Sequence, residues 1–120
     1  MEPIVKARRL VNKGKNTKAL ALYDELLAED PLNVESMTGK ALVLDRMRRS
    51  HEAVALAQKA VELAPDDLKA KERLAWLLLG RYGFAEALAL FESLPDNLAA
   101  EVGRASALLG LNRTAELEEL

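Results

Sequence analysis

Cysteine is absent from the 120-residue sequence, and histidine occurs once, at position 51. Without cysteine the chain can form no disulfide, no thiolate nucleophile and no cysteine-rich zinc site. A single histidine supplies no second or third metal ligand at a useful spacing. We therefore expect no cofactor and no bound metal. A chain without cysteine also suits a reducing compartment, and we expect a cytoplasmic protein.

Aromatic residues make up only 4% of the chain, and a strong net charge and long apolar runs are also missing. The net charge of −2 creates no global basic field that would recruit nucleic acid or acidic lipid. The longest apolar run, residues 74–79, is far shorter than the roughly 20 residues of a membrane-spanning helix. The first residues hold no apolar stretch of signal-peptide length. We expect neither nucleic acid nor a membrane among the partners.

Leucine and alanine are abundant instead, at 24 and 20 positions, with many glutamate, lysine and arginine residues. These residues favour helices, while β-branched and aromatic residues that favour strands are scarce. The composition therefore predicts an all-α protein. The length fits one domain over residues 1–120.

The sequence matches itself at an offset of 34 residues, which is the feature that organises the chain. The offset aligns small residues with small and apolar with apolar in three copies: Ala7, Ala41 and Ala75; Leu10, Leu44 and Leu78; Ala19, Ala53 and Ala87; and Pro31 with Pro65. Repeats are expected over about 1–33, 34–67 and 68–95, with a partial fourth over 96–120. Matching Ala87 to Ala115 gives 28 residues, so the third repeat has lost about six near Pro95.

Each repeat predicts two helices, separated by turn residues and ended by proline. The expected boundaries are Pro3 to Gly14 and Asn16 or Thr17 to Asp30, then Asn33 to Arg49 and Ser50 to Ala64, then Asp66 or Asp67 to Gly80 and Gly83 to Leu94. In the fourth repeat a helix capped by Asp96 or Asn97 is expected to end at Gly110, and Asn112 to cap a short final helix. Small residues at repeating positions are predicted to let paired helices approach closely. They are Ala7, Ala19, Ala41, Ala53, Ala75, Ala87 and Ala115, together with Gly103.

The pattern resembles the tetratricopeptide repeat, a 34-residue helix-turn-helix unit. The resemblance rests on Leu74 and Ala75, the clusters 84–87 and 50–53, Tyr23 and Phe91, and Pro31 and Pro65. It departs from the family at Pro3, Met37, Lys71 and Lys40, and at Arg48, where the turn glycine is missing. The resemblance implies an α-solenoid of stacked antiparallel helix pairs that forms a right-handed superhelix. Another α-solenoid or an antiparallel bundle is the alternative.

No arrangement of residues predicts catalysis. His51 has no partner ligand, and no nucleophile elbow, phosphate-binding loop or dinucleotide fingerprint is present. Asp66 and Asp67 suit a helix start, and Glu118 and Glu119 are adjacent carboxylates at a helix end. The basic clusters 8–18 and 46–49 lack an aromatic platform for nucleic acid and are read as solvated surface. We expect a protein that is not an enzyme.

The concave groove implied by the resemblance is the expected binding surface. Helical spacing assigns to it the residues left outside the core stripe. Trp76 with its basic neighbours has the composition of a binding hot spot, and burial as core is its alternative. The predicted partner-binding residues are Arg8, Leu42, Arg46, Lys69, Arg73, Trp76 and Arg104.

Some tetratricopeptide domains clamp the C-terminal carboxylate of heat-shock chaperones with five basic and asparagine residues. Lys69 and Arg73 match that clamp, whereas Ile4, Arg8 and Gly39 occupy its lysine and asparagine positions. Two matches of five are too few for a chaperone adaptor, so the expected partner is more broadly a protein or peptide with an acidic or carboxylate end. The predicted function is a non-catalytic protein-interaction module. The alternative is a scaffold that self-associates through exposed solenoid ends such as Ala115, Leu117 and Leu120.

Overall fold

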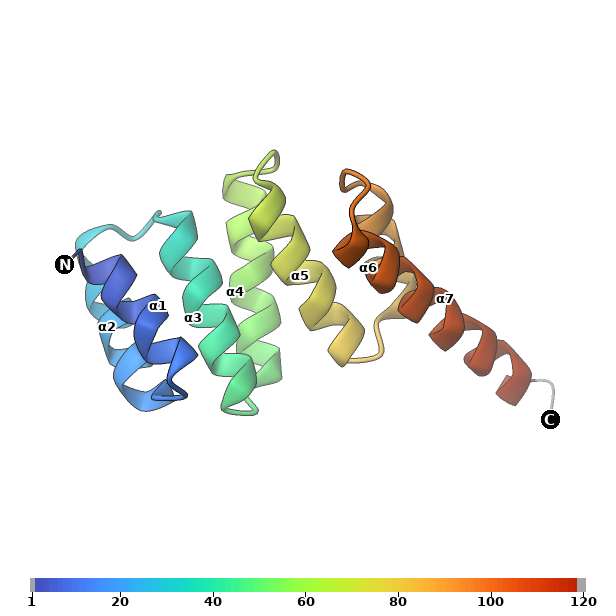
Figure 1. Ribbon diagram of the computed structural model, residues 1–120, viewed down its shortest axis with the longest axis horizontal. Coiled ribbons are helices and arrows are strands. Elements are labelled where there is room, and N and C mark those ends of the chain that lie inside the picture. The colour runs from blue at the N-terminus through green and yellow to red at the C-terminus, as the bar shows by residue number, and fades with distance from the viewer. Residues whose placement is uncertain (1, 119–120) are drawn as a thin grey trace. The chain divides into compact units, whose positions relative to one another are not determined.

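The computed structural model describes the backbone of residues 2–118 and the side chains of residues 2–113. This part of the chain contains helices and no strand (Figure 1). The helices are α1 (Pro3–Asn12), α2 (Asn16–Glu29), α3 (Val34–Arg46), α4 (Ser50–Leu63), α5 (Leu68–Gly80), α6 (Phe84–Glu92) and α7 (Leu98–Glu118). The predicted all-α class is confirmed.

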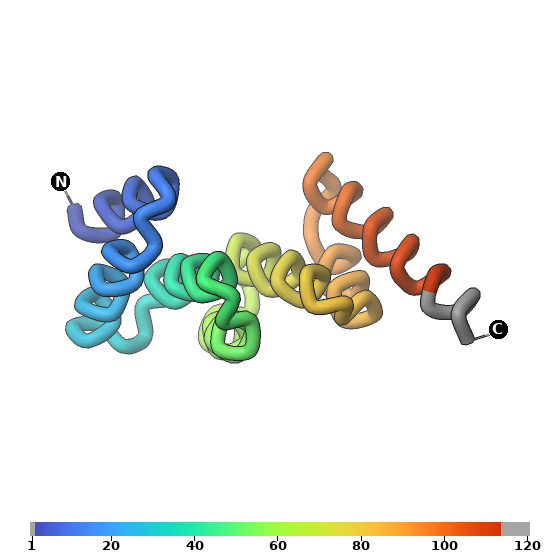
Figure 2. Tube along the Cα trace, turned by 90° about the horizontal axis from the view of Figure 1, so that it is seen from below, coloured from blue at the N-terminus to red at the C-terminus, as the bar shows by residue number. Residues whose placement is uncertain are grey.

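The chain divides into two compact units, which are described separately. Unit 1 is Met1–Asp66 and contains α1 to α4, and unit 2 is Asp67–Leu120 and contains α5 to α7. In unit 1, α2 packs against α1 and α3, α3 packs against α4, and α1 also contacts α3. In unit 2, α6 packs against α5 and α7, and α5 also contacts α7. The tube in Figure 2 follows this succession of helices from α1 to α7.

Asparagine and aspartate begin the first helix of three successive pairs. The Oδ1 atoms of Asn33, Asp67 and Asn97 accept hydrogen bonds from the backbone N–H three residues later, at 2.8, 3.1 and 2.8 Å. Such a cap satisfies one of the free amides of the first helical turn and is worth about 1 kcal/mol. The sequence predicted a helix start at Asn33 and caps at Asp66 or Asp67 and at Asp96 or Asn97; of these alternatives the structure uses Asp67 and Asn97. Asn16 is instead the first residue of α2, after Lys15.

The turn inside each helix pair uses one left-handed residue. Gly14, Arg48 and Tyr82 have φ values of +74°, +63° and +64° and lie 34 residues apart. Glycine adopts this conformation without the steric cost that a side chain brings. Arg48 and Tyr82 therefore hold a conformation that the fold imposes, because the turn between their helices requires it.

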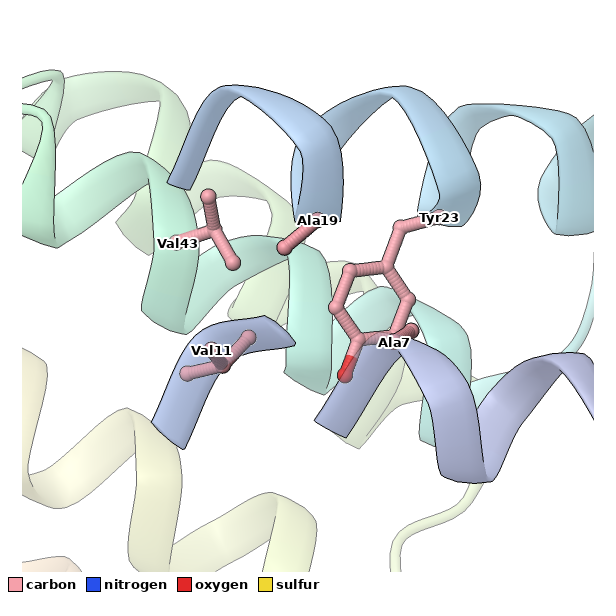
Figure 3. Packing of buried hydrophobic residues seen from close by; sticks show 5 residues of the cluster. All are labelled: Ala7, Val11, Ala19, Tyr23 and Val43. Carbon is pink, nitrogen blue, oxygen red and sulfur yellow. The ribbon is translucent and has the colours of Figure 1, made fainter. Parts of the chain in front are cut away.

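The predicted alanine contacts lie in the core of each unit. Ala7, Ala19, Ala41, Ala53, Ala75 and Ala87 are completely buried. In unit 1, Ala7 and Val11 of α1, Ala19 and Tyr23 of α2, and Val43 of α3 form one cluster (Figure 3). The side chain of Ala115 lies outside the residues whose side chains are described. Each small residue leaves room for the backbone of the opposite helix, so the alanine period sets where helices touch.

The predicted break at Gly110 is wrong, because α7 continues to Glu118. A glycine inside a helix weakens it but need not end it. Gly110 instead faces an aromatic ring of α6, and Gly103, a predicted close-contact position, faces another. A Cβ atom at Gly103 would lie less than 3.0 Å from ring atoms of Phe91, and one at Gly110 equally close to Phe84. The glycines are contact points, spaced seven residues apart on one face of α7.

The third helix pair is shorter than the others, as the spacing predicted. Helix α6 has 9 residues, whereas α2 and α4 have 14 each. The missing residues are therefore taken from the end of the second helix, just before Pro95. The side chain of Leu94 after α6 is still buried, so the shortened helix keeps its apolar end in the core.

Candidate functional site

Helix α5 carries the aromatic part of the predicted site. Lys69, Arg73 and Trp76 follow the spacing i, i+4, i+7 and share one side of α5, away from buried Leu74 and Leu78. Trp76 is half-buried, and its ring meets that of Phe91 edge to face, with centroids 5.0 Å apart and an interplanar angle of 73°. Trp76 therefore packs on a core residue and still exposes part of its indole.

Arg104 of α7 belongs to the same unit and has an internal carboxylate partner. Its Nη2 lies 3.3 Å from Oδ1 of Asp96, in the segment that precedes α7. The Arg104 side chain is 32% exposed and that of Asp96 is 82% exposed. An exposed pair of this kind contributes little to stability, so another carboxylate could exchange with Asp96 at small cost.

In unit 1, Arg8 of α1 and Glu35 of α3 form a similar pair. Arg8 Nε is 3.6 Å from Glu35 Oε1, and both side chains are more than half exposed. Sequence reasoning missed Glu35 and Asp96 as partners, since their proximity depends on how neighbouring helices pack. Two of the predicted ligand-binding arginines thus already face a carboxylate of the chain itself.

Leu42 and Arg46 of α3 both contact other residues of unit 1. Leu42 is half-buried against the cluster around Ala7 and Tyr23. Arg46 Nη1 donates a 3.0 Å hydrogen bond to the backbone carbonyl of Val11, in the last turn of α1. Carbonyls at a helix end lack partners within the helix, and a cation also suits the helix dipole there. Arg46 therefore joins α3 to α1.

Gly39 explains why one position of the chaperone clamp cannot carry asparagine. A Cβ atom at Gly39 would lie less than 3.0 Å from ring atoms of Tyr23, which is itself buried. Any side chain at this position would require the tyrosine ring to move. The departure from the clamp pattern at position 39 therefore follows from the packing of α2 on α3.

Two hollows in unit 1 differ in charge. The first has a volume of about 490 Å³ and is lined by Lys6, Arg9, Leu10 and Lys13. The second has a volume of about 320 Å³, and its lining combines apolar and acidic residues: Glu2, Pro3, Ile4, Leu26, Glu29, Asp30, Asn33, Glu35 and Ser36. The two linings share no residue, so unit 1 keeps a basic and an acidic hollow apart.

One surface ion pair shifts the ionisation of its members. Arg49, just before α4, binds Glu52 in the first turn of α4 through both carboxylate oxygens, at 3.1 and 2.6 Å. Hydrogen bonding from Arg49 lowers the pKa of the Glu52 carboxyl, and the same bond raises the pKa of Arg49. The pair is exposed and supports the start of α4.

Within the part of the chain that the structure describes, no three histidine, aspartate or glutamate side chains gather where they could hold a metal ion. Nor is any described helix long and apolar enough to cross a membrane. His51 lies at the exposed start of α4, where the sequence placed it.

Comparison with known proteins identifies the repeat. The tetratricopeptide repeat family matches residues 4–68 and 38–100. The inactive TPR repeat-containing thioredoxin TTL3 of Arabidopsis thaliana is 36% identical over 77 residues, or 64% of this chain but only 11% of that protein.

Two solved structures are similar in fold. The first TPR domain of human RPAP3 superimposes with a TM-score of 0.88 at 21% identity, over 95% of this chain and 93% of that one. The first TPR of Spaghetti (RPAP3), bound to the HSP90 peptide SRMEEVD, gives a TM-score of 0.84 at 22% identity, over 92% of this chain and 90% of that one. The family match covers most of the sequence, and this chain belongs to the tetratricopeptide repeat family.

Proposed function

We propose that this protein is a non-catalytic protein-interaction module that binds a peptide or partner segment in the concave groove expected of its family. The observation that carries the proposal is the position of Trp76. Its indole is held by Phe91 and remains partly exposed beside Lys69 and Arg73 on α5. A fixed, partly exposed tryptophan next to cations is typical of a binding hot spot, because it loses little conformational entropy on binding.

The ligand would be a segment with an acidic or carboxylate end. In the proposed complex Trp76 is the apolar anchor, while Lys69 and Arg73 pair with carboxylates. A similarly folded repeat domain is bound to the peptide SRMEEVD, which supports a ligand of this chemistry. Arg8 and Arg104 would contribute by releasing Glu35 and Asp96 in favour of ligand carboxylates. Leu42 and Arg46 would contribute least, since both are engaged in packing.

The test uses the peptide SRMEEVD as probe and the fluorescence of Trp76 as signal. Binding should change the emission of Trp76. Arg73→Gln should weaken the affinity for the peptide by about tenfold, as loss of a charge-assisted hydrogen bond does. Trp76→Phe should also weaken binding while keeping a ring against Phe91, measured by calorimetry. Lys59→Gln, on the exposed side of α4, is the matched control. Equal affinity of both site variants and the control would reject the proposal.

Self-association is the second candidate, and the surface of α7 favours it. Leu98, Val102 and Leu109 are 76%, 49% and 52% exposed and, with exposed Ala105 between them, follow the spacing i, i+4, i+7, i+11. This apolar stripe lies opposite the side that packs on α6. Two copies could pair antiparallel about Ala105, whose small side chain permits close approach.

Sedimentation over a concentration series tests this second candidate. A dimer should form that Val102→Lys with Leu109→Lys disrupts, because each copy would bury two charges in the interface. Leu32→Lys is the control, since Leu32 is 64% exposed but lies in unit 1. A protein that stays monomeric at high concentration excludes the α7 dimer and leaves the peptide-binding proposal intact.

A further inference from the structure

The outer side of α1 presents a basic face that the proposed peptide site does not use. Lys6 and Arg9 of α1 and Lys13 directly after it line the hollow of about 490 Å³, together with Leu10. All three cations are exposed, and Leu10 is half-buried against the core cluster of unit 1. The hollow therefore combines one half-buried apolar side chain with three exposed cations.

Helical geometry separates this face from Arg8, the one position of α1 predicted for the groove. The buried residues of α1 are Ala7 and Val11, and at 100° per residue Arg8 lies to one side of them. Lys6, Arg9 and Lys13 lie on roughly the opposite side from that buried pair. A ligand on this basic face would not touch Arg8, the position of α1 predicted for the groove.

The three cations have no acidic partner among the side chains of residues 2–113. Three of the other cations of unit 1 have one, namely Lys40 with Asp24 at 2.7 Å, Arg49 with Glu52 and Arg8 with Glu35. From residue 3 to residue 23 the chain carries six basic residues and no acidic one, although its net charge is −2. The positive charge of unit 1 is therefore concentrated here and not internally balanced.

Such clustering costs helix stability. Lys6 and Arg9 are three residues apart, and Arg9 and Lys13 are four apart, so both pairs face each other with like charge. Interaction of Arg9 and Lys13 with the C-terminal end of the helix dipole offsets part of this cost, but not for Lys6, which lies near the start of α1. An anionic partner that neutralises these charges would remove the repulsion and so stabilise α1.

We propose that the basic face of α1 is a second docking surface, which binds an acidic amphipathic helix of a partner protein. One apolar side chain of that helix would rest on Leu10. Carboxylates on either side would reach Lys6, Arg9 and Lys13, which span about 10 Å along α1 and match acids spaced i, i+3 or i+4, i+7. The lining has no aromatic side chain for stacking bases, and Leu10 alone offers too little apolar surface for a membrane.

The experiment measures the fluorescence anisotropy of a labelled synthetic helical peptide. The peptide consists of glutamate, with leucines spaced alternately three and four residues apart so that they share one face. We expect binding that weakens as salt is raised. In Lys6→Glu/Arg9→Glu/Lys13→Glu binding should weaken by roughly 30-fold, because each lost exposed pair contributes about a factor of three. The control is Arg48→Glu/Lys59→Glu/Arg113→Glu, which makes the same change in net charge on exposed positions elsewhere. It should bind nearly as the parent does.

Probe variants test the apolar part. A peptide with serine in place of leucine should bind several-fold more weakly. In the protein, Arg73→Gln should leave binding of this peptide unchanged, because Arg73 lies on α5 and is not part of the basic face. Equal losses in the two triple variants would mean a long-range charge effect and would overturn the proposal. So would tighter binding of an oligothymidylate or of anionic vesicles than of the peptide. Failure of SRMEEVD to bind would reject only the proposed function, since the two probes report on different surfaces.

Discussion

The contact between Gly103 of α7 and Phe91 of α6 offers a sharp test of how unit 2 is packed. Replacing glycine by alanine inside a helix normally stabilises it by about 1 kcal/mol, because alanine has the higher helix propensity. At Gly103 the added Cβ would lie less than 3.0 Å from three ring atoms of Phe91. That ring is completely buried and is contacted by Trp76, 5.0 Å away between centroids. It has little room to withdraw.

We expect Gly103→Ala to destabilise the protein, because the cost of overpacking exceeds the gain in helix propensity. Overpacking of a close-packed core costs about 1–3 kcal/mol, and a contact to three atoms of a confined ring places Gly103→Ala at the upper end. After subtracting the propensity gain of about 1 kcal/mol, we expect a net loss of about 2 kcal/mol. For a chain of this size that loss lowers Tm by about 8 °C.

Thermal unfolding followed by far-UV circular dichroism measures the effect, and Trp76 fluorescence reports the ring contact itself. Gly80→Ala is the matched control, because a Cβ at Gly80 meets nothing within 4 Å and the residue is exposed. It should leave Tm unchanged or raise it slightly. Phe91→Leu should partly rescue Gly103→Ala, giving a favourable coupling in the double-mutant cycle. If Gly103→Ala raises Tm as Gly80→Ala does, the close packing of α7 on α6 is refuted.

Three further changes test other contacts. Arg48→Gly should stabilise the protein by about 0.5 kcal/mol in chemical denaturation, because relief of the left-handed backbone at φ +63° exceeds the extra entropy of unfolded glycine; a loss would contradict the turn geometry. Arg46→Met should cost about 1–2 kcal/mol in the same assay by removing the bond to Val11, and an unchanged midpoint would show that bond to be unimportant. Arg49→Ala should raise the pKa of Glu52 toward its ordinary value in an NMR titration. Since the folded pKa of Glu52 is lowered, its contribution to stability is present above the unfolded pKa and is lost as pH falls through the folded one; no change in that pKa on substitution would exclude Arg49 as the cause.

The arginines show where prediction from local sequence stops. Spacing placed Arg8, Arg46 and Arg104 outside the core stripe, but all three have partners from other segments of their own unit. Those partners are 27, 35 and 8 residues away in sequence, so their proximity depends on helix packing and turn geometry. For Trp76 the core interpretation holds in part, because its ring contacts Phe91 while the residue is only half-buried. Its role as a binding anchor stays a prediction.

The sequence alone determined the helical class, the 34-residue period, the alanines where helices meet and the helix start at Asn33, and it narrowed two further caps to Asp66 or Asp67 and to Asp96 or Asn97. These features depend on local rules of backbone hydrogen bonding and on periodic burial, which a repeating sequence states several times. Only the tertiary structure decided that Gly110 is a contact point within one long helix, and that the predicted close contact at Gly103 is with the ring of Phe91. A glycine can end a helix or admit a neighbouring ring, and the choice depends on whether an aromatic side chain from another helix occupies the space it leaves open.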